Sequence, residues 1–465
     1  MKTHVILNRL FCLLLVLYIF SSCKKDDPSE TIDPDSNLPK FEATITGPSE
    51  GTINVLYDFS FQPQQANENY YIDWGDGTST TWFWQVSPGY SYMPPLNHKW
   101  NKSGTYGIHI KKDGYSWSDP FYITIKNTTT FYHCFSELMN GTVNGIYQLP
   151  DSSYLVFGNY TSNNVTMIFL SKLGSKGDVV WTKSYQRGNF KNYVITPSNE
   201  IIIIGYYFDY ILKLNFNGDE LYNASIQPPN GVSMTISDFI ATSDGNYFVS
   251  GYCHSSYSNY GAIIKIDPMG NTLWVSSING KQIDRIFEEN NGEIIALLSS
   301  SDFSMAKFDA NGNNIWTQII ATSNHKCKAI FKTMDNHYLI CAVASQPQMV
   351  FIKTDLDGNV ISYTPVENAS FSGIYSCITT SDNRYVWIGY SLYDYGSVGT
   401  AIKTDDQGNV IWSRDFNESN NFIKVIGNVS ETLDKGFAFG GYKNYDQYGN
   451  IVPIIAKTDS YGRMP

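Results

Sequence analysis

Residues Ile402–Trp412 read IKTDDQGNVIW, and this phrase decides the architecture of the chain. Close variants read IKIDPMGNTLW, AKFDANGNNIW and IKTDLDGNVIS, and looser variants read LKLNFNGDELY, SKLGSKGDVVW and AKTDSYGRMP. Each copy holds a lysine five residues before a glycine, and successive lysines are about 48 residues apart on average. The seven lysines are Lys172, Lys213, Lys265, Lys307, Lys353, Lys403 and Lys457. Self-similarity at a fixed period of this length indicates a tandem repeat architecture.

The phrase predicts a strand, a tight turn and a second strand. In Asp267-Pro268-Met269-Gly270 the Asp side chain can accept turn amides, Pro presets φ, and Gly takes the left-handed position. Apolar residues on both sides form the pleated arms. Lysine and aspartate two residues apart share a strand face, so we expect a local ion pair in each copy. A ring of lysines binding an anion is the alternative.

A second turn signal precedes each copy, with a β-rich segment on either side. These clusters are Pro150–Ser153, Thr196–Asn199, Ser243–Asn246, Asn290–Gly292, Met334–Asn336, Ser381–Asn383 and Leu433–Gly436. Each period therefore holds four short strands, A to D, which is typical of β-propeller blades. No stretch keeps a 3.6-residue apolar spacing, which excludes a helical solenoid. The sequence predicts an all-β chain with a seven-bladed propeller over residues 128–465.

The two ends of the repeat region predict how the ring closes. The seventh copy stops at Pro465, so its blade lacks an outer strand, while the β-like segment Phe131–Phe135 precedes the first blade unassigned. We expect this segment to pair into the last blade and latch the ring, because propellers hide edge strands in this way.

The first residues predict a secretion signal. Lys2 and Arg9 flank the apolar run Leu10–Phe20, which is too short for a permanent membrane helix. Small residues then precede Cys23, and this arrangement resembles the bacterial lipoprotein signal. The resemblance implies a signal peptide over residues 1–22 and a lipid on Cys23; an ordinary secretory signal is the alternative.

Residues 23–37 are charged and rich in Asp, Pro and Ser, a composition typical of a flexible tether. The run KKDDPSE resembles the export tag of Bacteroidetes-type surface lipoproteins. It implies a lipid-anchored protein of the outer membrane that faces the cell exterior, with a periplasmic orientation as the alternative. Since no second membrane segment is evident, the lipid would be the membrane contact.

Residues 38–127 lack the repeat phrase and form a separate predicted domain. Trp74-Gly75-Asp76-Gly77-Thr78 is followed by His98-Lys99-Trp100 and by Ser103-Gly104-Thr105-Tyr106. This ordered trio resembles the polycystic-kidney-disease (PKD) domain, an Ig-like β-sandwich. The resemblance implies that Trp74 is buried and that Gly75-Asp76-Gly77 is a hairpin turn.

An aromatic stretch interrupts this predicted sandwich: Trp82-Phe83-Trp84, followed by Tyr90 and Tyr92. One interpretation is packing against the propeller. The other is an exposed loop that stacks on a ligand, with Trp82 and Trp84 as the candidate binding residues.

Composition and motifs exclude several classes of function. The net charge of −11 and the absence of a basic, aromatic-interleaved patch argue against nucleic acid. No Cys/His spacing predicts a metal site, and no phosphate loop or dinucleotide fingerprint predicts a cofactor. The cysteines after Cys23 lie singly in different strands, which favours buried thiols over disulfides. They are Cys134, Cys253, Cys327, Cys341 and Cys377.

Two short motifs suggest chemistry but lack its context. Gly47-Pro48-Ser49-Glu50-Gly51 has the letters of a nucleophile elbow, yet it joins two strands rather than a strand and a helix. Asp355-Leu356-Asp357-Gly358 lacks the distal Glu of a calcium loop. No catalytic residue is predicted, although a propeller enzyme can assemble carboxylates from distant blades.

The B–C loops give the main functional hypothesis. They are rich in Tyr, Asn and Ser, and in a propeller they surround one mouth of the central channel. Flat aromatic surfaces with polar rims suit sugar rings or a protein epitope. The tyrosine of each recurring Gly-Tyr pair is interpreted as structural. The predicted ligand-binding residues are the mid-loop Tyr257, Tyr260, Tyr393, Tyr395, Tyr445 and Tyr448.

The sequence therefore predicts a non-enzymatic, cell-surface binding module for glycan or protein. The alternatives are a carbohydrate-active propeller enzyme, which requires converging carboxylates with perturbed pKa values, and a structural component of an outer-membrane assembly, which requires an extended apolar patch.

Overall fold

The computed structural model describes residues 38–464, except 128, 229–230, 255–258, 324, 345–347, 367–370, 394–395, 417–422, 424 and 446–448. Every named element in these ranges is a β-strand, as the sequence predicts. Within them, no helix is long and apolar enough to cross a membrane. The expected signal peptide, Cys23 and tether lie outside the described residues.

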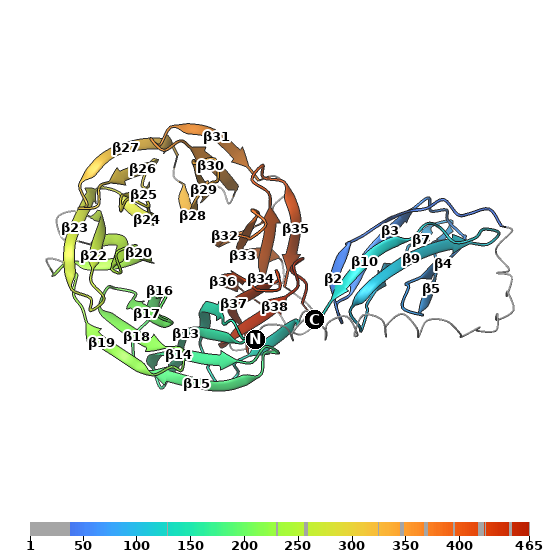
Figure 1. Ribbon diagram of the computed structural model, residues 1–465, viewed down its shortest axis with the longest axis horizontal. Coiled ribbons are helices and arrows are strands. Elements are labelled where there is room, and N and C mark those ends of the chain that lie inside the picture. The colour runs from blue at the N-terminus through green and yellow to red at the C-terminus, as the bar shows by residue number, and fades with distance from the viewer. Residues whose placement is uncertain are drawn as a thin grey trace, which may run out of the picture. The chain divides into compact units, whose positions relative to one another are not determined.

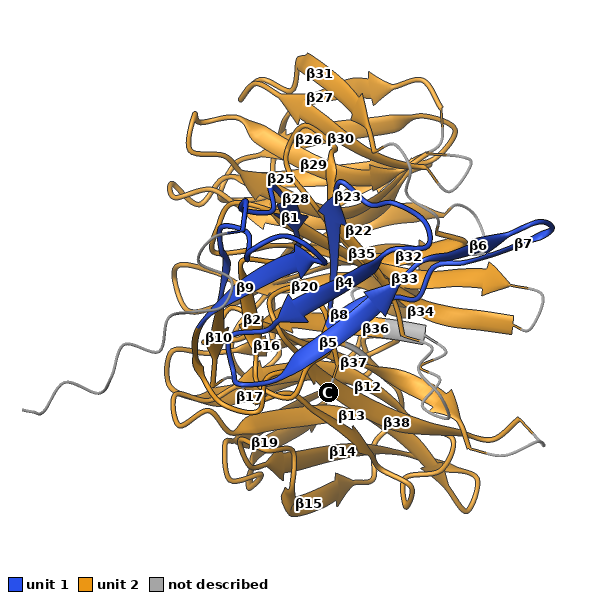
Figure 2. Cartoon of the chain, turned by 90° about the vertical axis from the view of Figure 1, so that its right-hand side faces the viewer, with its two compact units in different colours: residues 1–47, 58–97, 106–123 blue, residues 48–57, 98–105, 124–465 orange. Residues whose placement is uncertain are grey.

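The chain divides into two compact units (Figure 2). One contains residues 1–47, 58–97 and 106–123, and the other contains residues 48–57, 98–105 and 124–465. Short N-terminal segments are thus grouped with the repeat region, so the expected boundary at residue 127 stays a prediction.

Residues 44–126 form two sheets and a separate hairpin. The three-stranded sheet has the order β1 (Thr44–Thr46), β3 (Tyr57–Gln62) and β8 (Leu96–His98). The five-stranded sheet has the order β2 (Glu50–Thr52), β10 (Phe121–Lys126), β9 (Gly104–Lys112), β4 (Asn69–Asp73) and β5 (Ser79–Phe83). The hairpin pairs β6 (Gln85–Ser87) with β7 (Tyr90–Tyr92).

Aromatic rings from the two sheets share one core. Phe59 lies 5.6 Å from Trp74, and Phe61 lies 5.2 Å from Trp82, measured between ring centroids. Trp74 is fully buried. Its amide donates to the Thr78 carbonyl across a tight turn with two left-handed glycines. The expected burial of Trp74 and the hairpin turn at residues 75–77 are therefore confirmed.

The described part of the larger unit contains seven four-stranded antiparallel sheets, six of which are meanders of four consecutive strands (Figure 1). The first sheet contains β12 (Thr142–Gln148), β13 (Tyr154–Ser162), β14 (Val165–Leu173) and β15 (Val179–Tyr185). The second contains β16 (Phe190–Ile195), β17 (Glu200–Gly205), β18 (Tyr210–Asn215) and β19 (Glu220–Ser225). The third contains β20 (Ser233–Ala241), β21 (Tyr247–His254), β22 (Tyr260–Ile266) and β23 (Thr272–Asn279).

The next three sheets repeat this pattern. The fourth sheet contains β24 (Gln282–Glu288), β25 (Ile294–Ser299), β26 (Phe303–Phe308) and β27 (Asn314–Ala321). The fifth contains β28 (Lys326–Lys332), β29 (Tyr338–Val343), β30 (Met349–Thr354) and β31 (Val360–Pro365). The sixth contains β32 (Gly373–Thr379), β33 (Tyr385–Tyr393), β34 (Gly396–Thr404) and β35 (Val410–Asp415). In Figure 1 the first strands β16, β20, β24, β28 and β32 lie toward the middle of a ring, and the fourth strands β19, β23, β27, β31 and β35 lie at its rim. This arrangement is β-propeller-like, as the repeat predicts.

The seventh sheet draws its strands from both ends of the repeat region. Its order is β36 (Val425–Glu431), β37 (Phe437–Asn444), β38 (Ile451–Thr458) and β11 (Phe131–Cys134). β11 runs antiparallel to β38, with Phe131 opposite Lys457 and Cys134 opposite Ile454. The segment that the sequence left unassigned therefore supplies the fourth strand of this sheet.

Each innermost strand carries a register shift at the same place. A β-bulge leaves one extra residue unpaired. The extra residues are Asn144, Lys191, Ser237, Asp284, Lys328, Tyr375 and Gly427. A Cβ on Gly251, opposite one bulge, would lie 2.2 Å from the Thr235 carbonyl oxygen. The close approach of this carbonyl oxygen excludes a side chain at Gly251, whereas the equivalent positions in β25 and β29 hold Leu298 and Ala342.

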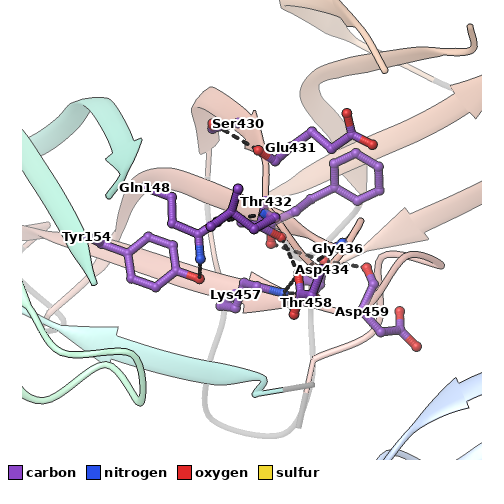
Figure 3. Close-up of polar contacts among 12 residues, drawn as sticks. Gln148, Tyr154, Ser430, Glu431, Thr432, Asp434, Gly436, Lys457, Thr458 and Asp459 are labelled. Atoms are coloured by element: carbon purple, nitrogen blue, oxygen red, sulfur yellow. Dashed lines mark hydrogen bonds and ion pairs between the residues drawn. The ribbon is translucent and has the colours of Figure 1, made fainter. Parts of the chain in front are cut away.

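The repeat lysines pair with acids other than those expected. Each lysine meets a carboxylate in or just after the turn between the first two strands of its own sheet. The Nζ–O distances are 3.8 Å for Lys172–Asp151, 2.7 Å for Lys213–Glu200, 2.6 Å for Lys265–Asp244, 2.7 Å for Lys307–Glu293, 2.6 Å for Lys353–Asp335, 2.8 Å for Lys403–Asp382 and 3.0 Å for Lys457–Asp434. Figure 3 shows the Lys457–Asp434 pair.

The aspartate of the phrase instead stabilises its own turn. Asp267 Oδ1 accepts the amides of Met269 and Asn271, each at 2.9 Å, and Oδ2 accepts the Asn271 side-chain amide at 2.8 Å. The same pattern recurs at Asp309, Asp355 and Asp405. The expected local Lys–Asp pair is therefore wrong, because the turn amides occupy both carboxylate oxygens.

Candidate functional site

A pocket of about 280 Å³ opens among the innermost strands of neighbouring sheets. Strands β20, β24 and β28 supply most of its wall, and Tyr206 and Tyr375 come from the β17–β18 connection and from β32. The lining residues are Tyr206, Thr235, Ile236, Ser237, Gln282, Asp284, Arg285, Lys326, Cys327, Lys328 and Tyr375. This volume lies near the lower end of the range for small-molecule sites.

The pocket lies where the innermost strands begin. Gln282 and Lys326 are the first residues of β24 and β28. A meander brings the connection from the preceding outer strand and the B–C loop to this same end of each sheet. The pocket therefore lies on the side of the ring that carries the tyrosine-rich loops.

Bulge residues build much of this wall. Ser237, Asp284, Lys328 and Tyr375 are each the extra residue of a bulge, contributed by β20, β24, β28 and β32. Because an extra residue escapes the alternation of the strand, it can face the ring axis while its neighbours pack between sheets. The repeated bulge thus positions different side chains at equivalent places.

Asp284 is the buried acid of the pocket. Its Oδ2 accepts the Cys327 amide at 3.0 Å, its Oδ1 accepts the Ser299 hydroxyl at 2.9 Å, and Lys326 Nζ lies 3.8 Å away. Burial raises the pKa of the Asp284 carboxyl above its usual value, although Lys326 and both hydrogen bonds oppose that change. The carboxylate faces the neighbouring strand β28 and helps to join the two sheets.

Arg285 connects three neighbouring innermost strands. Its Nη1 donates to the Ser237 carbonyl of β20 at 3.1 Å, and its Nε donates to the Lys328 carbonyl of β28 at 3.1 Å. Asp238 lies 3.8 Å from Nη1 and accepts the Ile286 amide at 3.1 Å. The guanidinium is therefore held rigidly beside the pocket.

The Lys326 side chain is more exposed than those of Arg285 and Asp284. Its Nζ donates to the Ser299 hydroxyl at 2.8 Å and to the Gln282 side chain at 3.3 Å. The Lys326 side chain is 45% exposed, compared with 6% for Asp284. With Lys328 and Arg285, the pocket holds three cationic side chains and one carboxylate.

Tyrosines form another part of the mouth. Tyr375 is 44% exposed, and its ring lies 5.9 Å from that of Tyr390. Burial, with smaller contributions from Tyr442 and Tyr390, raises the pKa of Tyr375. Tyr206 and Tyr390 belong to the recurring Gly-Tyr pairs, whose structural role stays a prediction, and Tyr206 also lines the pocket.

The mid-loop tyrosines have a different outcome. Tyr260 begins β22 and is half-buried. Tyr393 is 39% exposed and its hydroxyl donates to Asp415, whereas Tyr445 is 52% exposed. None of these three lines the pocket. The other three predicted residues, Tyr257, Tyr395 and Tyr448, lie outside the described residues.

The predicted stacking residues of the aromatic stretch separate into two environments. Trp82 is 3% exposed, packs against Phe61 and Tyr70, and donates its indole N–H to the Pro94 carbonyl at 2.9 Å. Its assignment as a ligand-stacking residue is therefore wrong, because β5 directs it into the core. Trp84 is half-buried and its indole donates to Ser91 Oγ at 3.2 Å.

Sequence reasoning missed the charged pocket residues, although a signal for them exists. The innermost strands contain apolar residues three positions apart, as in Ile236-Ser237-Asp238-Phe239 and Ile283-Asp284-Arg285-Ile286. A regular strand repeats every two residues, so a spacing of three indicates an inserted residue. That signal marks the bulge positions.

Two features bear on redox and metal chemistry. The described thiols Cys134, Cys253, Cys327, Cys341 and Cys377 are free; four of them are buried, as the sequence predicts, whereas Cys134 is half-buried. Among the described residues, no group of three or more His, Cys, Asp or Glu side chains is arranged to hold a metal ion.

The comparisons with known proteins bear on the fold. No protein-family model and no curated protein matches the chain. Similar solved structures include a protein of unknown function from Bacteroides caccae (13% identity, TM-score 0.41, covering 61% of this chain and 96% of that one). Another is a catalytically inactive variant of virginiamycin B lyase from Staphylococcus aureus with quinupristin (7% identity, TM-score 0.47, covering 70% of this chain and 98% of that one). A third is the Dos1 propeller (10% identity, TM-score 0.43, covering 72% of this chain and 96% of that one). At these scores the similarity carries no functional argument, so the fold assignment rests on the strand pairing.

Proposed function

We propose that the seven sheets are the blades of a closed seven-bladed propeller and that β11 is its latch. The Gln148 side chain of β12 accepts the Leu433 amide from the last sheet at 2.7 Å. Val143 and Ile146 share a buried cluster with Ala438 and Ile455. These contacts join the first and last sheets directly, whereas in an open array the two terminal sheets would not touch each other.

We infer that this propeller is a non-enzymatic binding module for a glycan or a protein. The observation that carries the proposal is the pocket on the loop side of the ring, where aromatic and polar side chains from several blades converge. Such a pocket with a few convergent polar groups is the usual form of a ligand site. Tyr206 and Tyr375 replace the mid-loop tyrosines as the principal candidates for ligand contact.

A carbohydrate-active enzyme is the second candidate, favoured by the raised pKa of Asp284 inside the pocket. Against it, both oxygens of Asp284 accept hydrogen bonds from the protein, and Asp238 accepts the Ile286 amide. These contacts support a structural role. Turnover of a bound glycan that is lost in Asp284→Asn would favour the enzyme.

The proposal places the protein on the outer membrane, lipid-anchored at Cys23, with a PKD-like domain as a spacer. It rests on the signal and tether composition of residues 1–37 and on the motif trio in residues 38–127. Cys23→Ser should abolish fatty-acid labelling and membrane association. Surface proteolysis of intact cells would distinguish the exterior from the periplasmic orientation.

The binding proposal is tested with a protein beginning at residue 38 in glycan-array and protein-capture screens. Tyr206→Ala and Tyr375→Ala should each weaken binding of a captured ligand at least tenfold. The matched control is Tyr122→Ala, which removes a 61% exposed tyrosine from β10. Unchanged binding in both pocket variants would overturn the pocket version of the proposal.

A further inference from the structure

We propose that the pocket recognises an acidic saccharide, with the sugar carboxylate held by Lys326, Lys328 and Arg285 and the sugar ring placed against Tyr206 and Tyr375. This inference rests on the proposed binding function and specifies its ligand class. Three features of the molecule support it: the cations of the pocket are more exposed than its anions, most ion pairs of the repeat show the opposite order, and tyrosines form part of the pocket wall.

The charges in the pocket are arranged so that cations are more accessible than anions. In the Lys326–Asp284 pair the lysine side chain is 45% exposed and the aspartate 6%. In the Arg285–Asp238 pair the corresponding values are 25% and 10%. The carboxylates face neighbouring strands, where backbone amides bind them. A ligand in the pocket therefore meets ammonium and guanidinium groups first.

Six of the seven repeat ion pairs show the opposite order, and in the Lys213–Glu200 pair the two side chains are almost equally exposed, at 23% and 21%. In the Lys265–Asp244 pair the lysine is 14% exposed and the aspartate 48%, and in the Lys403–Asp382 pair the values are 10% and 55%. Since these acids lie in the A–B turns, they belong to the other end of the sheets. The acids cover the repeat lysines, which removes the lysine ring as an anion site. The accessible charge of the pocket is therefore positive, whereas the end of the sheets with the A–B turns exposes acids and the whole chain has a net charge of −11.

The chemistry of the wall favours a sugar acid over a simple inorganic anion. Aromatic rings offer flat apolar surfaces for the C–H face of a sugar, and Gln282 and Thr235 add polar groups. Arginine and lysine bind carboxylates through charge-assisted hydrogen bonds, and a recessed site of one sign concentrates the opposite charge. A volume of about 280 Å³ fits a short saccharide segment rather than a folded protein surface.

The test measures binding of two acidic probes, trigalacturonate and sialyllactose, to the full chain by calorimetry at low salt. Their uncharged counterparts are the methyl esters of trigalacturonate and of sialyllactose. We expect at least one acidic probe to bind at least tenfold more tightly than its counterpart, with affinity falling as salt rises. Lys326→Gln should weaken binding about tenfold, and Lys326→Arg should restore most of it.

The control is Lys183→Gln, which makes the same charge change on β15, where Lys183 pairs with Asp219. Thermal melting of each variant verifies folding. Equal affinity for charged and uncharged probes, with loss in Tyr375→Ala, would overturn the charge inference and leave the binding proposal intact. A protein ligand that binds through Tyr206, without saccharide binding, would also overturn it. If no ligand depends on either tyrosine, the proposed function itself fails.

Discussion

At the scale of single residues, the seven repeat lysines occupy equivalent places in unequal surroundings. Lys457 is the most enclosed: its side chain is 1% exposed, and its Nζ donates to the Thr458 carbonyl at 2.6 Å and to Asp434 at 3.1 Å (Figure 3). Burial lowers the pKa of Lys457, and the nearby Asp434 opposes that change. The lysine at this repeat position is therefore expected to contribute different amounts to the stability of the protein in different sheets.

We predict that Lys457→Met destabilises the protein by about 1–3 kcal/mol, because it leaves Asp434 and the Thr458 carbonyl without their shared donor. Lys265→Met should cost about 0–1 kcal/mol, because Asp244 is 48% exposed and water replaces the lysine. Chemical denaturation of both variants measures the difference. Equal losses would contradict the assigned role of burial.

The lysines also show where residue-level inference from sequence stops. The repeat correctly identified each lysine as a paired structural residue, but Asp267 was assigned as the partner of Lys265 instead of Asp244. Sequence proximity favoured Asp267, whereas the three-dimensional arrangement gives that carboxylate to the amides of its own turn. A side chain with two competing partners cannot be assigned from spacing alone.

At the scale of elements, aspartates in the turns stabilise the hairpins through hydrogen bonds and ion pairs. The Asn313 side-chain amide, with backbone amides of the same turn, lowers the pKa of Asp309, and Asn359 does the same for Asp355. Lys353 lowers the pKa of Asp335 in an A–B turn. Both kinds of hairpin therefore depend on ionised acids.

This dependence predicts acid sensitivity. Since the folded pKa of each acid is depressed, its contribution is present above the unfolded pKa of about 4 and is lost as pH falls through the folded value. The melting temperature should therefore stay nearly level above about pH 5 and fall below about pH 4. Asp309→Asn and Asp355→Asn together should make that fall shallower, measured by melting from pH 7 to pH 2. The same acid response in the double variant would contradict this account.

The elements themselves were predictable where local chemistry fixes them. Turn residues with apolar arms identified the four-strand period and the spare strand at residue 131, and Trp74 was placed correctly in the sandwich core. The bulges and the pocket were not predicted, because register depends on the partner strand. Lys326, Asp284 and Tyr375 are separated by up to 91 positions, counted from 284 to 375, and meet through the curvature of the ring.

At the scale of the molecule, the last blade and the first blade share a buried core. Ile455 of β38 packs in one cluster with Val143 and Ile146 of β12. Ile263 of β22 has the equivalent position between interior sheets, with Ile283 and Ile286 of β24. Both isoleucines are fully buried. The proposed closure should therefore make the terminal sheet as stable as an interior one.

We predict that Ile455→Ala and Ile263→Ala each cost about 2–5 kcal/mol, the usual range for emptying such a site. In a closed ring both variants should keep one cooperative propeller transition, because every blade has two neighbours. Calorimetry and hydrogen exchange of β38 provide the measurement. A separate early transition confined to the last sheet in Ile455→Ala would indicate an open array.

The bulges on the innermost strands have a consequence for how such a protein can diversify. Their seven extra residues range from glycine through serine and lysine to tyrosine, while the neighbouring apolar positions hold the sheets together. Exchange at an inserted position leaves the strand ladder untouched. Substitutions at these inserted positions can therefore change the charge and shape of the pocket wall, one strand at a time, while the packing between the sheets is kept.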